Sequence, residues 1–331
     1  MKIIKICLIM VAVVLLSGCS SANNADSSEP FIEHTPQLTS EGEISTQPYT
    51  VALVMKTLTN PFFIEMEKGA RLAEIDFGIE LVVKTAAQET SIEQQIAIVD
   101  QLIKDKVDAI VIAPGDSLEL IPVLKQAQDA GIVVINIDNQ LDVEFSEKIG
   151  LVNVPFISVD NEQSAYLSAK YISDQITTPT DVAVLEGIQS ALNAEARKNG
   201  ALRAFSENPN ITVVVMESAH WKIDEAYDVS KQIFANHPNI GALFCANDMM
   251  ALGAINYLQE TDRDDVLVAA YDALEEAKQA VREGTLQITI DQQAAQQGYL
   301  GIEYAVRTLN GQELPAETLV DALPVTIETL E

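Results

Sequence analysis

The sequence predicts an α/β protein that contains two doubly wound parallel-sheet domains. From residue 49 onward, short apolar runs alternate with longer amphipathic stretches, which is the pattern of a parallel sheet covered by helices. This alternation runs through the chain twice. A chain of 331 residues with 48% hydrophobic content is also long and apolar enough for two packed cores. We therefore expect two α/β units in tandem.

The first half of the chain alternates predicted strands and helices. Short apolar runs typical of buried strands lie at 50–55, 80–84, 108–113 and 132–137. Stretches with helical spacing of apolar residues lie between them, at 61–76, 91–104 and 118–130. Ser91 and Gln94 fit a capping box at the start of the second of these helices. Gly131 stands where a helix stop is expected after the third.

The same alternation then restarts in the second half. Strand candidates lie at 157–159, 181–185, 212–216, 241–244, 266–270 and 287–290. Helix candidates lie at 161–175, 194–207, 223–236, 249–260 and 274–283. A final helix at 294–310 and a late strand at 324–328 have no partners of their own at the C-terminal end, so we expect them to return to the earlier halves.

Charge and cysteine content exclude several classes of protein. The formal net charge is −29, from 20 basic and 49 acidic residues, and this sign repels nucleic-acid phosphates. Nucleic-acid binding through a basic face is therefore not expected. Cysteines occur only at 7, 19 and 245, which supports no disulfide framework. The three histidines, at 34, 220 and 237, are too scattered to suggest a metal site.

The N-terminal segment reads as an export signal followed by a tether. Lys2 and Lys5 precede an apolar run at 6–16 that is too short to span a bilayer. The run ends in Leu16-Ser17-Gly18-Cys19, which resembles the lipobox of bacterial lipoproteins. This resemblance implies a signal peptide at 1–18 and a lipid on Cys19; an ordinary secretory signal with an incidental cysteine is the alternative. Polar residues 19–48 then predict a flexible tether.

Polar side chains gather just after the predicted strands, where ligands bind in parallel α/β sheets. Lys56 and Asn60 follow the first strand of the first half. The others follow later strands: Asp138, Asn139, Asp160, Asn161, Asn247, Asp248 and Asp272. Aromatic residues fall at or near the same ends, at Phe62, Phe63, Trp221 and Tyr271. Planar polar groups that bind vicinal hydroxyls, together with rings that pack on C–H faces, are what a sugar site requires.

Each of these residues also has a purely structural interpretation. The aspartates could be helix N-caps, which is a common use of Asp at such positions. We favour the cap for Asp160 and Asp248, and a ligand role for Asp138 and Asp272. Lys56 could be a surface cation, Arg197 could pair with Glu195, and Trp221 could be simple core. Cys245 is expected to be a buried small hydrophobe.

Three segments of the sequence resemble a known family. These are VALVMKTLTNPFF at 51–63, NAEARKNG at 193–200 and FCANDMMALG at 244–253. They are similar to the periplasmic monosaccharide-binding proteins of ABC importers, of the ribose-binding type, over about residues 49–329. Within that family the allose-binding pattern is the most similar, because ribose binders usually have a small residue where Lys56 stands.

The resemblance implies a role for each matching residue. It places Lys56, Asn60, Phe63 and Asp138 on the N-terminal side of the ligand, with Phe62 beside Phe63. It places Arg197, Asn247, Asp272 and Trp221 on the C-terminal side, and Gln292 at a hinge crossover. Asn139 and Tyr271 adjoin these positions and complete the set of expected ligand-binding residues. Asn139 departs from the acidic residue of the allose pattern and Phe63 from its Trp, which leaves the sugar undecided between allose-like sugars and ribose.

The same resemblance implies a domain organisation and a hinge. The expected fold is the type I periplasmic binding protein fold, with crossovers near residues 159, 292 and 321. One lobe would contain 49–159 and 293–321, and the other 160–292 and 322–331. Closure around the ligand would be a hinge motion.

Several functions compete at this point. The first is an extracytoplasmic, lipid-anchored and monomeric protein that delivers a monosaccharide to an ABC permease; a sensor that presents its sugar to a membrane receptor or histidine kinase is the alternative. Paired carboxylates could serve a glycosidase, but the sequence has no catalytic triad pattern, metal cluster, Walker loop or dinucleotide fingerprint. A sugar-responsive repressor would need a helix-turn-helix before its core. We therefore expect no enzyme activity, no cofactor and no metal.

Overall fold

The structure is a computed structural model that describes residues 37–38, 44–45 and 48–330. The chain divides into two compact units, Met1–Gln47 and Pro48–Glu331. In the first unit, β1 (Gln37–Leu38) pairs antiparallel with β2 (Ile44–Ser45), inside the segment predicted to be a tether. The predicted signal peptide at 1–18 and the predicted lipidation site Cys19 lie outside the described residues.

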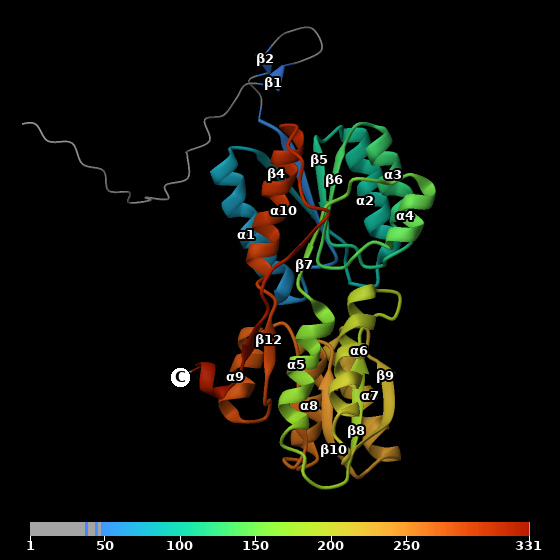
Figure 1. Cartoon of the computed structure of the whole chain (residues 1–331), viewed down its shortest axis with the longest axis vertical. Helices are drawn as coiled ribbons and strands as arrows, with labels where there is room; N and C mark the ends of the chain where they lie inside the picture. Colours follow the sequence, from blue (N-terminus) through green and yellow to red (C-terminus); the bar gives the residue numbers. More distant parts are fainter. Residues whose placement is uncertain (1–36, 39–43, 46–47, 331) are drawn as a thin grey trace, which may run out of the picture. The chain divides into compact units, whose positions relative to one another are not determined.

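The second unit begins with a parallel sheet of six strands in the order β13-β7-β6-β5-β3-β4 (Figure 1). Its strands are β3 (Thr50–Met55), β4 (Glu80–Thr85), β5 (Ala109–Ile112), β6 (Val133–Ile137), β7 (Phe156–Ser158) and β13 (Glu317–Leu319). The central strands are apolar and buried on both faces, as the continuous hydrophobic runs predict. Thus Val51, Leu53 and Met55 pack into one core, whereas Ala52 and Val54 pack into the other.

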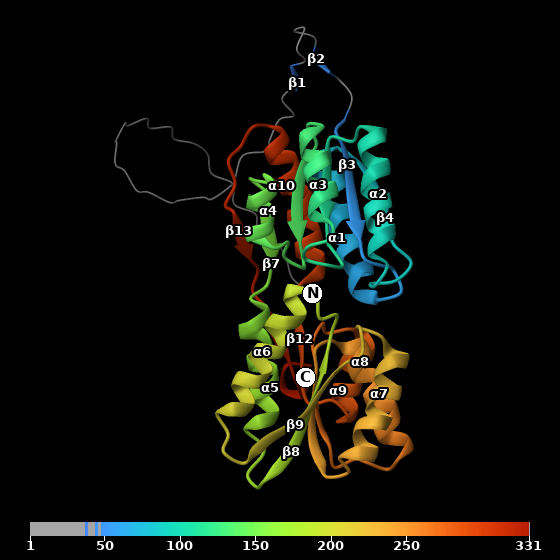
Figure 2. The ribbon, with the colours of Figure 1, turned by 90° about the vertical axis from the view of Figure 1, so that its right-hand side faces the viewer.

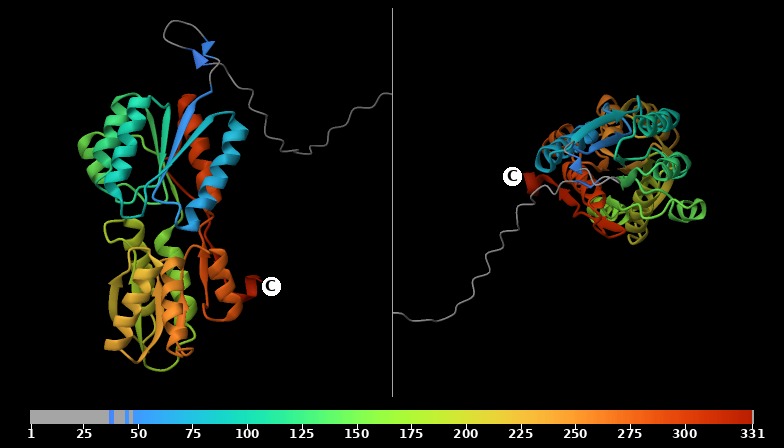
Figure 3. Two further views of the ribbon diagram at one scale, coloured as in Figure 1. Left: turned by 180° about the vertical axis from the view of Figure 1, so that it is seen from behind. Right: turned by 90° about the horizontal axis from the view of Figure 1, so that it is seen from above.

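Helices cover both faces of this sheet. One face carries α1 (Pro61–Phe77) and α10 (Ala294–Leu309), which pack closely against each other (Figure 3). The other carries α2 (Ile92–Asp105) and α3 (Ile121–Asp129), and α3 contacts α4 (Val143–Ile149). We call this sheet and these helices the N-terminal lobe.

A second parallel sheet has the strand order β11-β10-β8-β9. Figure 1 labels β8, β9 and β10 of this sheet, and Figure 2 labels β8 and β9. Its strands are β8 (Thr180–Glu186), β9 (Ile211–Ser218), β10 (Ile240–Cys245) and β11 (Leu267–Ala269). Strand β12 (Thr289–Asp291) follows β11 and pairs antiparallel with β14 (Leu323–Val325).

Helices α5 (Asn161–Ser173) and α6 (Leu192–Ser206) pack together on one face of this sheet. Helices α7 (Ile223–Asn236) and α8 (Asp248–Glu260) pack on the other, and α8 contacts α9 (Glu275–Glu283). We call this sheet and these helices the C-terminal lobe; the short α11 (Ile327–Leu330) packs on α9. The predicted fold class, with two parallel-sheet lobes, is confirmed.

The chain passes between the lobes three times. It crosses after β7, again between β12 and α10, and a third time between β13 and β14. As expected, the last helix returns to an earlier part of the chain, since α10 packs on α1 and on strands of the N-terminal lobe. The late strand likewise returns, because β14 pairs with β12.

Several local expectations are wrong. Strand β7 does not start the second half, because it pairs with β6 and β13 of the first sheet. The capping box does not form. The Ser91 side chain makes no capping bond, and the Gln94 side chain accepts from the Ala87 amide instead of the Ser91 amide. The late strand ends at Val325 and a helical turn follows. The sequence patterns also missed α4, β13 and α11, which are each short.

No helix within the described ranges combines the length and the apolar character that a membrane span requires.

Candidate sugar-binding site

One cavity lies between the two lobes, at the carboxyl ends of both parallel sheets. It is lined by side chains from both lobes: Lys56, Asn60, Phe62, Phe63, Glu89, Asp138, Asn193, Arg197, Trp221, Asn247, Asp272 and Gln292. Every predicted ligand residue except Asn139 and Tyr271 is in this set. Each lining residue is buried, so a ligand can enter only when the lobes part.

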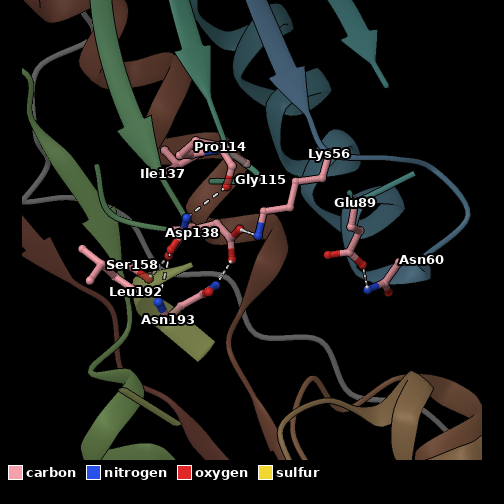
Figure 4. Close-up of polar contacts among 12 residues, drawn as sticks. Lys56, Asn60, Glu89, Pro114, Gly115, Ile137, Asp138, Ser158, Leu192 and Asn193 are labelled. Carbon is pink, nitrogen blue, oxygen red and sulfur yellow. Dashed lines mark hydrogen bonds and ion pairs between the residues drawn. The ribbon is translucent and has the colours of Figure 1, made fainter. Parts of the chain in front are cut away.

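The N-terminal lobe contributes a buried ion pair. Lys56 directly follows β3 and Asp138 directly follows β6, and their Nζ and Oδ2 atoms lie 2.7 Å apart (Figure 4). Each side chain is only 3% exposed, so both charges depend on each other and on the polar groups around them. The Ser158 hydroxyl donates to the Asp138 carbonyl at 2.8 Å, which holds this strand end in place.

Two aromatic rings stand beside this ion pair. Phe62 and Phe63 open α1 and meet edge to face, with their ring centroids 5.1 Å apart. The Lys56 Nζ lies 5.7 Å from the Phe63 centroid. Asn60 positions both rings, because its Oδ1 accepts from the Phe62 amide and caps α1.

Glu89 is a lining residue that the sequence interpretation missed. It lies in the loop after β4, and its Oε1 accepts from Asn60 Nδ2 at 3.0 Å (Figure 4). Burial raises the pKa of the Glu89 carboxyl, an effect that the nearby Lys56 charge opposes. The signal for it was present, because Glu89 follows a predicted strand as the other ligand candidates do.

The C-terminal lobe is organised around Arg197, which projects from α6. Its Nε donates to Asn161 Oδ1 at 2.8 Å, its Nη1 to the Ala246 carbonyl at 3.0 Å and its Nη2 to Gln292 Oε1 at 2.9 Å. The guanidinium also lies over the Tyr271 ring, 4.0 Å from its centroid. Tyr271 therefore acts behind the cavity wall, and it supports Arg197 rather than lining the cavity.

Asp272 completes this polar cluster. Its Oδ1 accepts from Gln292 Nε2 at 2.5 Å and lies 3.6 Å from Arg197 Nη1. Burial raises the pKa of the Asp272 carboxyl well above its usual value, while the Arg197 charge acts in the opposite direction. Gln292 thus uses both ends of its amide to connect the hinge to Arg197 and Asp272.

Trp221 covers the cavity from the C-terminal lobe. Its ring centroid lies 5.4 Å from the Arg197 guanidinium carbon, and it is 4% exposed. Gly187 allows this position, because a Cβ there would lie 1.9 Å from the indole. The backbone is left-handed at Trp221 (φ 66°) and at Asp138 (φ 65°), and φ is 127° at Asp272. Such strained conformations cluster at functional sites.

The structure separates cap residues from cavity residues at the other strand ends. Asp160 caps α5 by accepting from the Gln163 amide, as expected. Asp248 does not cap α8, because Asn247 does so through its Oδ1 and the Met250 amide. Asp248 instead accepts from the Leu274 amide and from the Thr289 hydroxyl. Asn247 therefore combines the cap with a place in the cavity wall.

Asn139 lies outside the cavity wall, unlike its predicted role. It is fully buried and its Nδ2 donates to the Pro114 carbonyl at 3.2 Å. Its Oδ1 accepts from the backbone amide of Asn193 at 3.1 Å. The Asn193 side chain enters the cavity in its place, with Nδ2 3.5 Å from Asp138 Oδ1 (Figure 4). Asn193 was part of a recognised motif, but its position at a helix start gave no sign of this contact.

The arrangement can bind a compact neutral molecule that carries many hydroxyl groups. Carboxylates accept hydrogen bonds, Lys56 and Arg197 donate them, and the amides do both. The aromatic rings offer flat apolar faces on both sides of the cavity. In the described part of the chain, no group of His, Cys, Asp or Glu side chains is arranged to hold a metal ion.

The fold and the cavity together define a class of protein. In this class the chain passes three times between two α/β lobes, and the lobes enclose a polar cavity between their strand ends. The family model of the periplasmic binding protein domain matches residues 51–313, and this chain belongs to that family.

Individual relatives agree with this assignment. A D-ribose/D-allose-binding protein of Pseudomonas aeruginosa is 37% identical over 308 residues, which are 92% of this chain and 91% of the relative. The D-allose-binding periplasmic protein of Escherichia coli is 30% identical over 283 residues, which are 83% of this chain and 91% of the relative. A solved ABC transporter periplasmic solute binding protein of Actinobacillus succinogenes, with bound D-allose, superposes with a TM-score of 0.80 at 40% identity, covering 85% of this chain and 98% of that chain.

Proposed function

We propose that this protein is the extracytoplasmic sugar-binding component of an ABC importer, and that it holds one monosaccharide between its lobes. The observation that carries the proposal is the buried cavity, which both lobes line with planar polar groups and with aromatic rings. A monosaccharide matches this lining, because its hydroxyls can both donate and accept while its C–H faces pack on rings.

D-allose, or a closely related hexose or ketose, is the first ligand of this proposal and ribose is the second. The names of the two relatives above, and the allose bound in the structural neighbour, support this choice. One departure from the allose pattern, Asn139, makes its hydrogen bonds outside the cavity wall. The other, Phe63, lines the cavity, so it is the position where this site would differ most from that pattern.

Titration calorimetry and thermal-shift measurements with a panel of aldohexoses, ketoses, pentoses and polyols test the proposal. A ligand that binds only the folded state raises its stability by RT ln(1 + [L]/Kd), so the best ligand gives the largest shift. We expect D-allose to give it at 1:1 stoichiometry, with ribose weaker. A panel in which no monosaccharide shifts the melting temperature would contradict the function.

Lys56 provides the test of selectivity. Its ammonium can donate three hydrogen bonds while it faces Asp138, so the pair should favour sugars with adjacent hydroxyls on that edge. In Lys56→Ser, we expect the rank order of allose, psicose, ribose and galactose to change. An unchanged rank order would remove the main argument for an allose-like ligand.

The proposal includes a permease as partner, a monomeric state and a lipid anchor at Cys19. The structural neighbour at 40% identity is an ABC transporter periplasmic solute binding protein, which supports delivery to a permease and gives no support to the sensor. The lipid anchor rests on the sequence Leu16-Ser17-Gly18-Cys19 alone. We expect no turnover of the bound sugar.

A further inference from the structure

Helix α6, which carries Arg197, has no cap from its own lobe. The residue at its N-cap position is Ala191, whose methyl group cannot accept a hydrogen bond. The amides of Leu192 and Asn193 are the first two of the helix and have no partner within it. A Ser, Thr, Asp or Asn at the N-cap is the preferred way to satisfy one of these amides, as Asp160 does for α5.

The N-terminal lobe supplies the missing acceptors. Ser117 Oγ accepts from the Leu192 amide at 3.1 Å, and Asn139 Oδ1 accepts from the Asn193 amide at 3.1 Å. The Ser117 amide donates in return to the Ser190 carbonyl at 3.2 Å. Ser117 and Asn139 are 3% and 0% exposed, so these bonds are shielded from water. Figure 4 shows Leu192 and Asn193 beside the strand end that carries Asp138.

The two acceptors are held in position before they meet α6. Asn139 Nδ2 donates to the Pro114 carbonyl and to Ser117 Oγ, both at 3.2 Å, and Asn139 Oδ1, which faces the helix, also lies 3.4 Å from Ser117 Oγ. Asp116 Oδ1 accepts from the amides of Leu118 and Glu119, which fixes the turn that carries Ser117. The acceptors therefore do not have to be ordered when the lobes meet.

We propose that Ser117 and Asn139 cap α6 across the cleft and so act as a latch that favours the closed state of the two lobes. We call Ser117, Asn139 and residues 190–193 the α6 latch. When the lobes part, the α6 amides lose their acceptors, and when the lobes close, the latch sets α6 and Arg197 in place. The latch touches no part of the cavity wall except Asn193, so it strengthens the binding of every sugar by the same factor.

The first experiment separates the latch from a direct sugar contact. Asn139→Ala and Ser117→Ala should each weaken allose and ribose binding by one common factor, about 2-fold to 10-fold for one lost hydrogen bond. Gln128→Ala is the matched control, because it also removes side-chain bonds to backbone in this lobe, at Val152, but does not face α6. Unequal factors for the two sugars, or an unchanged affinity, would overturn the latch.

The second experiment needs no sugar. Trp221 is the single tryptophan of the sequence and is buried when the lobes are closed. Acrylamide quenching of its fluorescence therefore reports the fraction of open molecules. Without ligand, Asn139→Ala and Ser117→Ala should be quenched more strongly than the wild type. The affinity test rests on the proposed function, whereas the quenching test does not. If no sugar binds, the quenching test alone decides. Equal quenching of the wild type and both variants would overturn the latch.

A third variant should raise stability and weaken sugar binding at the same time. Ala191→Ser supplies an acceptor from within the lobe, so α6 is capped in both the open and the closed state. It should raise the melting temperature while weakening sugar binding by about the factor seen for Asn139→Ala. The melting curve also shows whether the variant is folded. A folded Ala191→Ser that binds sugar as tightly as the wild type would be incompatible with capping across the cleft.

Discussion

Three carboxylates and two cations line the cavity, and this imbalance is the main feature of the site at the residue scale. Lys56 is paired with Asp138, and Arg197 lies beside Asp272, whereas Glu89 is held by the Asn60 amide. Burial raises the pKa of both Glu89 and Asp272, because each carboxylate has lost water. A sugar hydroxyl that donates to these oxygens would replace part of that lost hydration.

Removal of Asp272 should therefore cost more than one hydrogen bond. Asp272→Ala leaves the Gln292 amide and sugar hydroxyls unpaired in a buried site, which we expect to cost about 2 to 4 kcal/mol, or about 30-fold to 1000-fold in affinity. Calorimetry measures the loss, with Asp265→Ala, an exposed carboxylate of the same lobe, as control. Wild-type affinity in Asp272→Ala would show that the residue does not contact the ligand.

Helix α10 is the main feature at the scale of elements, because it follows the second crossover and returns to the N-terminal lobe. It can pack closely on α1 because Gly298 faces the Met66 carbonyl, from which an added Cβ would be 2.1 Å away. The contact between the two helices therefore depends on the missing side chain.

Gly298→Ala should separate the two helices and destabilise the protein. The forced shift should exceed the gain in helix propensity, so we expect a net loss of about 1 to 3 kcal/mol in the free energy of unfolding. Urea denaturation measures it, and Gln296→Ala, at an exposed position of the same helix, should change stability by no more than about 0.5 kcal/mol. Equal stabilities of the two variants would mean that α10 does not pack on α1 as described.

For the whole molecule, Asp248 is a buried carboxylate through which stability depends on pH. Burial raises the pKa of Asp248 to about 6, although the Thr289 hydroxyl, the Leu274 and Tyr271 backbone and Arg197 act against this. The folded state therefore holds a proton on Asp248 at pH values where the unfolded state, with a pKa near 4, has lost it. The contribution of this group to stability accordingly decreases as the pH rises from about 4 to about 6.

Asp248→Asn should remove this dependence. Its stability relative to the wild type should improve by about 2 kcal/mol between pH 4 and pH 7, whatever constant packing cost the substitution adds. Urea denaturation over this range measures the difference, with Asp105→Asn, at an exposed carboxylate, as control. A constant difference between Asp248→Asn and wild type across the range would show that Asp248 is ionised throughout.

In the proposed function, a lipid on Cys19 anchors the whole molecule to the membrane. Cys19→Ala removes the thiol to which a lipid would be attached, so the variant should leave the membrane fraction while it binds sugar as the wild type does. Fractionation followed by immunoblotting measures the distribution. Unchanged membrane retention of the variant would contradict lipidation at this residue.

Regular patterns in the sequence were sufficient to predict most of the elements and the fold class. Strand β3 and helix α7 begin and end as predicted, because apolar periodicity depends only on neighbouring residues. Lys56, Asp138 and Asp272 were found for a related reason: carboxyl ends of parallel strands meet at one edge, so position along the chain predicts position in space.

The tertiary structure alone decided which polar residues line the cavity and which make hydrogen bonds outside its wall. Asn139 and Asp138 are neighbours in sequence, yet one caps α6 across the cleft and the other lines the cavity, because the backbone turns at Asp138 with φ 65°. Glu89 follows a predicted strand and could have been predicted in the same way as Lys56, whereas Asn193 enters the cavity only because distant segments converge there. The spacing of strands in the sequence predicts which residues lie at the cleft. Contacts between the lobes depend instead on how the hinge brings side chains together, and no local sequence pattern predicts this.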